Sequence, residues 1–358
     1  MQMLSAAEAV GPAWERTKEV LFEHRSWRLY FKLSAVATLA ALGNGFNFNL
    51  NVPARTLNNS GNAGHAAAAM IAAAAAAFFL IFLIALAIFL VLFYAGSRMQ
   101  FVLIDVVARR ETVIRPLWDR YGAPTWKWIG VKVALFLAML AVVAALMAPF
   151  LFAIFRQAKK GPQSQMSAGA ALSLFGAIAL LFVVIVAFFA ILYLLRDFVL
   201  PVMALENAPL GEGVRRLRLM LRHEPGQMLL YLFLRFILGI MLGIAAIIVL
   251  ILGMAIVGVP VVGGCWALWH TIAAHGSAGA KILVVAACIV GGLVTLGWTV
   301  FVYICSAGFV TTFFQAYALY FFAGRYPLLG EVLEPSGQSW WNLPPSEPFN
   351  PPSTAPEP

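Results

Sequence analysis

Long apolar runs, separated by short polar segments, dominate the pattern of this chain. A membrane-spanning helix needs about 20 mostly apolar residues, and six segments fit or approach this length. The first is short and carries Lys32 near its start. The last begins at Ile282 and stays uncharged to Arg325, so we expect an apolar extension beyond one crossing. The predicted spans are residues 29–42, 66–94, 133–155, 172–195, 236–259 and 282–306.

Composition turns this pattern into a fold class. Hydrophobic residues make up 62% of the 358 residues and charged residues 11%, against roughly 45–50% and about 25% in soluble domains. A soluble enzyme, a disordered protein and a disulfide scaffold are therefore excluded. The sequence predicts an all-α, polytopic integral membrane protein.

The charged residues predict the orientation. Nineteen of the 24 Lys and Arg, and all 15 acids, fall on one side of the six spans. Because cytoplasmic loops collect Lys and Arg, we expect a multi-pass protein of the bacterial cytoplasmic (inner) membrane with both termini in the cytoplasm. The net charge of +9 then reflects orientation, and nucleic-acid binding is not expected.

Short similarities between cytoplasmic segments predict an internal repeat. At offsets of 97 and 118 residues, three segments place Gln100, Asp197 and Gln315 at one equivalent position. A third relation aligns residues 10–43 with residues 210–243 without gaps. The repeating unit would be a cytoplasmic interfacial helix followed by a transmembrane hairpin, used three times. The alternative is that apolar helices align by chance.

The segment after Pro209 predicts the clearest interfacial helix. Leu210, Val214, Leu217 and Leu221 share one helix face, which is typical of a helix lying in the headgroup plane. Four arginines fall largely away from this face and form a predicted binding site for anionic lipid headgroups. They are Arg215, Arg216, Arg218 and Arg222.

The two ends of the chain predict cytoplasmic segments. Residues 1–28 read as a cytoplasmic amphipathic helix rather than a signal peptide, and Ser5 and Glu8 fit a capping box. Residues 333–358 contain eight prolines and form a predicted disordered tail, which is either solvated or bound by a protein partner. Residues 29–332 form the membrane domain between them.

Metal and cofactor chemistry are not expected. Cys265, His270 and His275 follow no defensible zinc spacing, and the three cysteines read as small buried hydrophobes. The alternating residues 44–51 form either a ligand lip outside the membrane or a loop that folds its aromatics onto the interface.

Few ionisable residues lie within the spans. Asp197 beside Arg196 suggests either a proton or ion relay or, favoured here, an interfacial ion pair or a snorkelling arginine that sets the depth of the span. Nucleotide-binding and hydrolase motifs are absent from the sequence. A third hypothesis is an interfacial enzyme around Asp105 and Asp197.

A resemblance accompanies these features. Residues 44–51, the segment Asp197-Phe198-Val199-Leu200-Pro201 and residues 213–221 resemble bacterial six-span proteins that include the membrane domain of glycerophosphoryl diester phosphodiesterases. In those enzymes catalysis belongs to a separate soluble barrel, so the resemblance implies a membrane domain and no catalytic residue. We therefore expect a non-enzymatic membrane accessory or scaffold domain that contacts anionic lipid. The alternative is a transporter or permease for a small or lipidic substrate.

Overall fold

The protein is helical throughout the part of the chain that the computed structural model describes. This part covers residues 4–22, 27–43, 64–110, 113–158, 168–206, 208–273 and 276–333, and it contains no strand. The predicted tail after residue 333, residues 44–51 and His275 lie outside it. The helices are α1 (Val10–Phe22), α2 (Trp27–Leu42), α3 (Gly64–Arg109), α4 (Ile114–Arg120), α5 (Gly122–Ala158), α6 (Ala168–Leu194), η2 (Leu195–Val199), α7 (Leu200–Glu206), α8 (Leu210–His223), α9 (Pro225–Leu268), η3 (Trp269–Ala273), α10 (Ala278–Ala323) and α11 (Pro327–Leu333).

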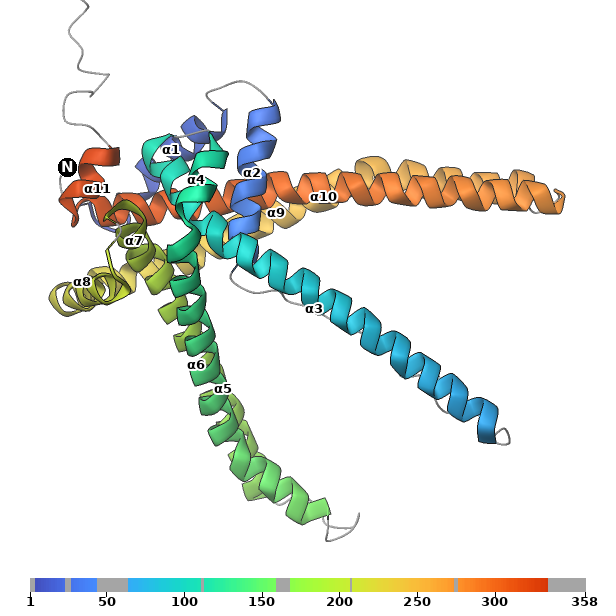
Figure 1. Ribbon diagram of the computed structural model, residues 1–358, viewed down its shortest axis with the longest axis horizontal. Helices are drawn as coiled ribbons and strands as arrows, with labels where there is room; N and C mark the ends of the chain where they lie inside the picture. Colours follow the sequence, from blue (N-terminus) through green and yellow to red (C-terminus); the bar gives the residue numbers. More distant parts are fainter. Residues whose placement is uncertain are drawn as a thin grey trace, which may run out of the picture.

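Three arms radiate from one hub (Figure 1). The antiparallel pair α5 and α6 forms one arm, the pair α9 and α10 forms the second, and α3 forms the third. The hub contains α1, α2, α4, η2, α7, α8 and α11, together with the adjoining ends of the long helices. Both α1 and α11 lie in the hub, so the described chain begins and ends there.

Within the described residues, five helical segments are long and apolar enough to cross a membrane. They are Ala74–Arg109, Gly122–Phe150, Phe175–Glu206, Pro225–Ile272 and Ala278–Ala323.

The first predicted span is not among these five segments. Helix α2 has only 16 residues, or about 24 Å at 1.5 Å per residue, against a hydrocarbon core of about 30 Å. The predicted extension of the last span is a continuation of the same helix, because α10 runs unbroken for 46 residues into the hub.

The packed core lies in the hub, whereas the arms are exposed. Phe101, Trp128 and Phe321 are each at most 1% exposed in the hub. Along the arms, Phe82 and Phe182 are 47% and 67% exposed. Apolar side chains of this kind are stable only in an apolar solvent, so the arms fit a bilayer and the hub folds like a soluble core.

The capping box at the N-terminus is confirmed. The backbone N–H of Ser5 donates to Glu8 Oε2 at 2.8 Å, and the backbone N–H of Glu8 donates to Ser5 Oγ at 3.3 Å. These reciprocal bonds satisfy two donors at the start of the helical N-terminal segment.

Helix α2 is held by two very close backbone approaches. A Cβ built on Gly43 would lie 2.5 Å from the carbonyl carbon of Gly96 in α3. A Cβ built on Gly308 in α10 would lie 2.5 Å from Ser34 Cα. Both neighbours are backbone or Cα atoms and cannot rotate away, so glycine is what lets α2 wedge between α3 and α10.

We expect Gly308→Ala to destabilise the protein by about 1–3 kcal/mol, the usual cost of overpacking a close contact. The added methyl group has to push α2 away from α10. Thermal unfolding of the full chain in detergent, followed by tryptophan fluorescence, measures the effect.

Gly297→Ala is the matched control on the same helix, because a Cβ there meets no atom within 4 Å. Removing this helical glycine should leave stability unchanged or raise it by up to about 1 kcal/mol. Equal destabilisation by both variants would contradict the close contact between α2 and α10.

Candidate functional site

The polar groups of the hub form a candidate site, and its first part closes the C-terminus of α2. Lys132 from α5 donates to Gly43 O at 2.8 Å, Ser97 Oγ at 3.1 Å and Gln100 Oε1 at 3.0 Å. Gln100 donates to Ala40 O at 2.9 Å. Helix C-termini carry unpaired carbonyls and a partial negative charge, so this buried cation and amide stabilise the end of α2.

Helix α1 caps the C-terminus of α3 in the same way. Arg16, only 2% exposed, donates from Nε to Val107 O at 2.9 Å and from Nη2 to Ala108 O at 2.8 Å. Arg110, just after α3, adopts the left-handed conformation with φ 58°. Its guanidinium lies 2.7 Å from Glu19 of α1, and this ion pair holds a backbone conformation that is rare for a side chain of this size.

Two further arginines cap helix ends. Arg98 donates to Trp118 O in the last turn of α4 at 2.7 Å. Arg325 donates to Phe321 O near the end of α10 at 3.0 Å, and it pairs with Glu224 at 2.7 Å. Cations from other segments of the chain therefore close the C-termini of α2, α3 and α4, and Arg325 closes its own helix.

Asp197, a predicted site residue, lies in the π-helical turn η2. The N–H of Leu200 bonds to Leu195 O, which defines the wider turn. Pro201 follows directly, and proline lacks an N–H and clashes with the carbonyl four residues earlier. That carbonyl belongs to Asp197, which gives a local reason for the wider turn. Such turns are frequent at functional sites.

Asp197 is buried and forms an ion pair with Arg235 of α9. It also accepts a hydrogen bond of 2.7 Å from the hydroxyl group of Tyr231, and Tyr231 accepts one of 2.8 Å from Arg235. The carboxylate is thus enclosed by its own partners. This geometry favours an ion pair over a relay, but the partner of Asp197 is Arg235 of α9 rather than the neighbouring Arg196.

Gln100 and Asp197 sit in similar arrangements. Gln100 accepts from Trp128 Nε1 at 2.8 Å and from Lys132, four residues later on α5. Asp197 accepts from Tyr231 and from Arg235, four residues later on α9. Each residue therefore meets an aromatic donor and a cation one helical turn apart on the next long helix.

Gln315, the third predicted equivalent, is buried in α10 at 2% exposure. Its Nε2 has no hydrogen-bond acceptor among the described residues. Among the described residues, this amide nitrogen thus lacks a partner such as Ala40 O, which accepts from Gln100.

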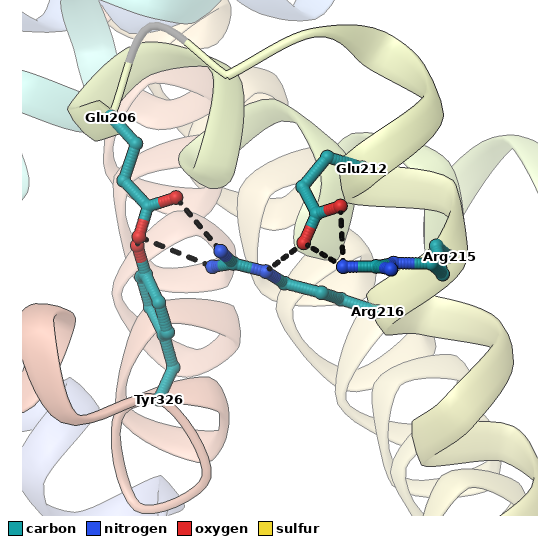
Figure 2. A network of polar contacts seen from close by, with 5 residues as sticks. All are labelled: Glu206, Glu212, Arg215, Arg216 and Tyr326. Atoms are coloured by element: carbon teal, nitrogen blue, oxygen red, sulfur yellow. Dashed lines mark hydrogen bonds and ion pairs between the residues drawn. The ribbon is translucent and has the colours of Figure 1, made fainter.

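Two of the four predicted headgroup-binding arginines are engaged by acids (Figure 2). Arg215 pairs with Glu212 at 2.8 Å, and Arg216 pairs with Glu212 at 3.1 Å and with Glu206 at 3.0 Å. Tyr326, after α10, donates to Glu206. The network ties α7 and α8 to the end of α10.

This network also shifts the protonation of its members. Its hydrogen bond with Glu206 raises the pKa of Arg216 above its ordinary value. The hydrogen bond from Arg215 lowers the pKa of Glu212. Burial and then the hydrogen bond to Glu206 raise the pKa of Tyr326 to about 12, so the phenol stays protonated at neutral pH.

The other two predicted arginines are exposed. Arg218 and Arg222 project from α8, and no ion pair or hydrogen bond to another described residue engages them. Of the predicted apolar face, Leu217 is buried in the hub, whereas Val214 and Leu221 are 40% and 39% exposed. The free surface of α8 thus combines cations with apolar side chains.

A small pocket of about 200 Å³ adjoins this surface. Met220, His223 and Glu224 line it together with Met228 of α9 and Arg325. Within the described residues, no group of three His, Cys, Asp or Glu is arranged to hold a metal ion.

Sequence reasoning missed Arg16, Lys132 and Arg325 as structural cations. Their carbonyl partners include Val107, 91 positions from Arg16, and Gly43, 89 positions from Lys132. Each was counted only as a cytoplasmic charge. The i, i+4 pairing of Trp128 with Lys132 is the one local signal that could have pointed to a shared partner.

Comparison with known proteins gives a family match. A family model described as "Family of unknown function (DUF7544)" matches residues 4–332. The match covers the hub and all three arms and ends before the proline-rich tail. Neither a curated protein nor a solved structure matches the chain.

We expect Asp197→Asn to lower the free energy of unfolding by about 3–5 kcal/mol, because it leaves the Arg235 charge buried without its partner. Thermal unfolding of the full chain in detergent measures the change. The double variant Asp197→Asn/Arg235→Met should lose less than the sum of the two single variants, by roughly 0.5–3 kcal/mol.

Asp119→Asn on α4 is the control, since this exposed acid should change stability by less than about 0.5 kcal/mol. Strict additivity of the Asp197 and Arg235 variants would show that the two groups do not stabilise each other.

Proposed function

We propose that this chain, which belongs to the DUF7544 family of unknown function, is a non-enzymatic accessory or scaffold protein of a membrane whose hub binds anionic lipid headgroups. The observation that carries the proposal is the surface of α8. There, exposed Arg218 and Arg222 flank exposed apolar side chains at the end of the molecule that carries the polar network.

Six crossings fit the path of the chain. The five long segments all have one end in the hub and one far end. Because α1 and α11 both lie in the hub, the chain must leave the hub three times and return three times. The proposed first crossing comes before Gly64, and residues 44–63 lie outside the described part of the chain. With the excess of Lys and Arg on the hub side, this path supports a bacterial inner-membrane protein with cytoplasmic termini.

Three hairpin repeats also fit the packing. A short helix precedes each outgoing segment: α1 before α2, α4 before α5, and α8 before α9. Each short helix packs on the end of a returning helix: α4 on α3, α8 on η2, and α1 on α10. Because α1 contacts α10, the first and last of these units are neighbours, and the three units form a ring. This ring supports three units that each combine a hub helix with a hairpin.

Lipid binding at α8 follows from the arrangement of charge and apolar surface. A basic residue near an anionic membrane surface contributes about 1 kcal/mol. Arg218 and Arg222 lie four residues apart, about one helical turn, and so can meet the same headgroup region. Val214 and Leu221 add apolar contact with the acyl boundary.

The occupied polar groups favour a scaffold over a permease. A transporter needs polar groups that face a cavity near the middle of the membrane. Lys132, Gln100 and Asp197 instead lie in the hub, where partners from the same chain engage them. An enzyme around Asp105 meets the same difficulty, because Tyr121 and Arg109 contact that carboxylate.

We expect Arg218→Gln/Arg222→Gln to weaken binding of phosphatidylglycerol to the full chain roughly thirtyfold, the equivalent of about 2 kcal/mol. Native mass spectrometry of the protein in neutral detergent, titrated with short-chain phosphatidylglycerol, measures the affinity. Phosphatidylcholine serves as the zwitterionic reference and should bind equally to both proteins.

Arg115→Gln/Arg120→Gln on α4 is the matched control. It removes the same charge from two exposed arginines of another hub helix, so its phosphatidylglycerol affinity should stay near that of the unaltered chain. Equal weakening by both double variants would assign the effect to net charge and would reject α8 as the site.

A further inference from the structure

The helices α9 and α10 are in close register along their shared arm. A Cβ built on Gly253 of α9 would lie 2.8 Å from Val302 Cγ1 of α10. Towards the far end, a Cβ on Gly258 would lie 3.6 Å from Thr295 Cγ2. One turn further, a Cβ on Gly291 of α10 would lie 2.8 Å from a methyl group of Val261. These contacts form one continuous line of facing positions.

The next facing positions on this line are both cysteines. Cys265 follows Val261 by one turn of α9, and Cys288 precedes Gly291 by about one turn of α10. The register therefore places the two thiols opposite each other in the contact between α9 and α10. Both are free and partly exposed. The third cysteine, Cys305, lies 17 residues along α10 from Cys288, or about 26 Å, and cannot join them.

We propose that Cys265 and Cys288 form a reversible disulfide that joins α9 to α10 near the far end of their arm. A disulfide requires Cα atoms within about 7 Å. Helices packed through glycines at Gly253, Gly258 and Gly291 approach closely enough to meet this requirement. The inference rests on the register of the arm and goes beyond the lipid-binding function of the hub.

The chemistry is a thiol–disulfide exchange with an external disulfide oxidant. One thiol loses its proton, and its thiolate attacks the oxidant to give a mixed disulfide and release one reduced thiol. The second cysteine then attacks the mixed disulfide as a thiolate, which forms the Cys265–Cys288 bond and releases the other reduced thiol. The two cysteines lose two electrons in total, and the oxidant is reduced to two thiols.

The location of the two cysteines indicates the compartment in which the disulfide would form. In the proposed orientation the hub is cytoplasmic, so the far ends of the arms face the opposite side of the membrane. Disulfides persist in extracytoplasmic compartments and are rare in the cytoplasm. Only this extracytoplasmic location rests on the orientation given under the proposed function.

The first experiment tests the geometry in detergent with the full chain. The purified protein is reduced or treated with oxidised glutathione, then denatured and labelled with a maleimide–polyethylene glycol that adds a countable mass at each free thiol. We expect three additions to the reduced chain and one, at Cys305, to the oxidised chain. The proposal would be overturned by three additions after oxidation, by loss of the label at Cys305, or by a disulfide between two chains.

Matched variants separate pairing from folding. Cys305→Ser should keep the disulfide and show no addition after oxidation. Cys265→Ser and Cys288→Ser cannot form the bond within the chain, so the intact mass of each oxidised variant should show at most added glutathione and no loss of two hydrogens. A disulfide that still forms within the chain in either of these two variants would contradict the assigned pair.

The second experiment tests whether the two cysteines are oxidised in cells. Cells that produce the protein are quenched with N-ethylmaleimide at harvest, and the purified chain is then reduced and labelled at the thiols that were protected as disulfides. Two labelled cysteines, Cys265 and Cys288, are expected. A fully reduced pair in cells, from a protein whose pair oxidises in detergent, would overturn the extracytoplasmic placement of the far end while leaving lipid binding at α8 to its own test.

Discussion

The hub depends on the capture of helix C-termini by cations. Where several helices end in one buried region, their last carbonyls lack intrahelical partners and carry partial negative charge. Lys132 and Arg16 meet these carbonyls at the ends of α2 and α3, and Arg98 and Arg325 do so at α4 and α10. These four Lys and Arg residues therefore stabilise the hub directly, by binding the ends of its helices. Two of these cations also pair with carboxylates, Arg16 with Glu19 and Arg325 with Glu224.

The hub and the arms differ in how they bury side chains. The hub buries aromatic, aliphatic and capped polar groups as a soluble domain does, whereas each arm exposes Phe, Leu and Ile along its length. The arms need only a satisfied backbone, which a continuous helix provides, and an apolar solvent. Contacts between different hairpins are thus concentrated where water and headgroups make burial of apolar surface favourable.

The sequence predicts features that depend on neighbouring residues and misses contacts between residues far apart in the chain. Uninterrupted apolar runs predict the long helices because a spanning helix satisfies its own backbone, and Ser5 with Glu8 predicts the capping box that is found. The first predicted span is a helix, α2, but at 16 residues it is shorter than the other long helices, and it packs between α3 and α10. The site was predicted only in part. Asp197 was recognised from its type and place, but neither the partner of Lys132 nor the facing of Cys265 and Cys288 has a local pattern, since both depend on how separate helices pack.

The contacts between a returning helix and the next long helix differ in their chemistry around the hub. Gln100 and Asp197 each join a returning helix to the next long helix through an aromatic donor and a cation. In the gapless alignment, Tyr231 and Arg235 correspond to Phe31 and Ala35 of α2, which carry neither a donor nor a charge.

The joint between α10 and α2 is therefore made differently. Gly308 packs directly on Ser34, and Thr38 donates to Ile304 O at 3.2 Å. Gln315 is left with a buried amide nitrogen that no described group accepts from. A buried ion pair adds little net stability but is costly to break, whereas close backbone packing needs only small residues. The contact between α10 and α2 therefore depends on close packing at Gly308, where the contacts of Gln100 and Asp197 depend on charge.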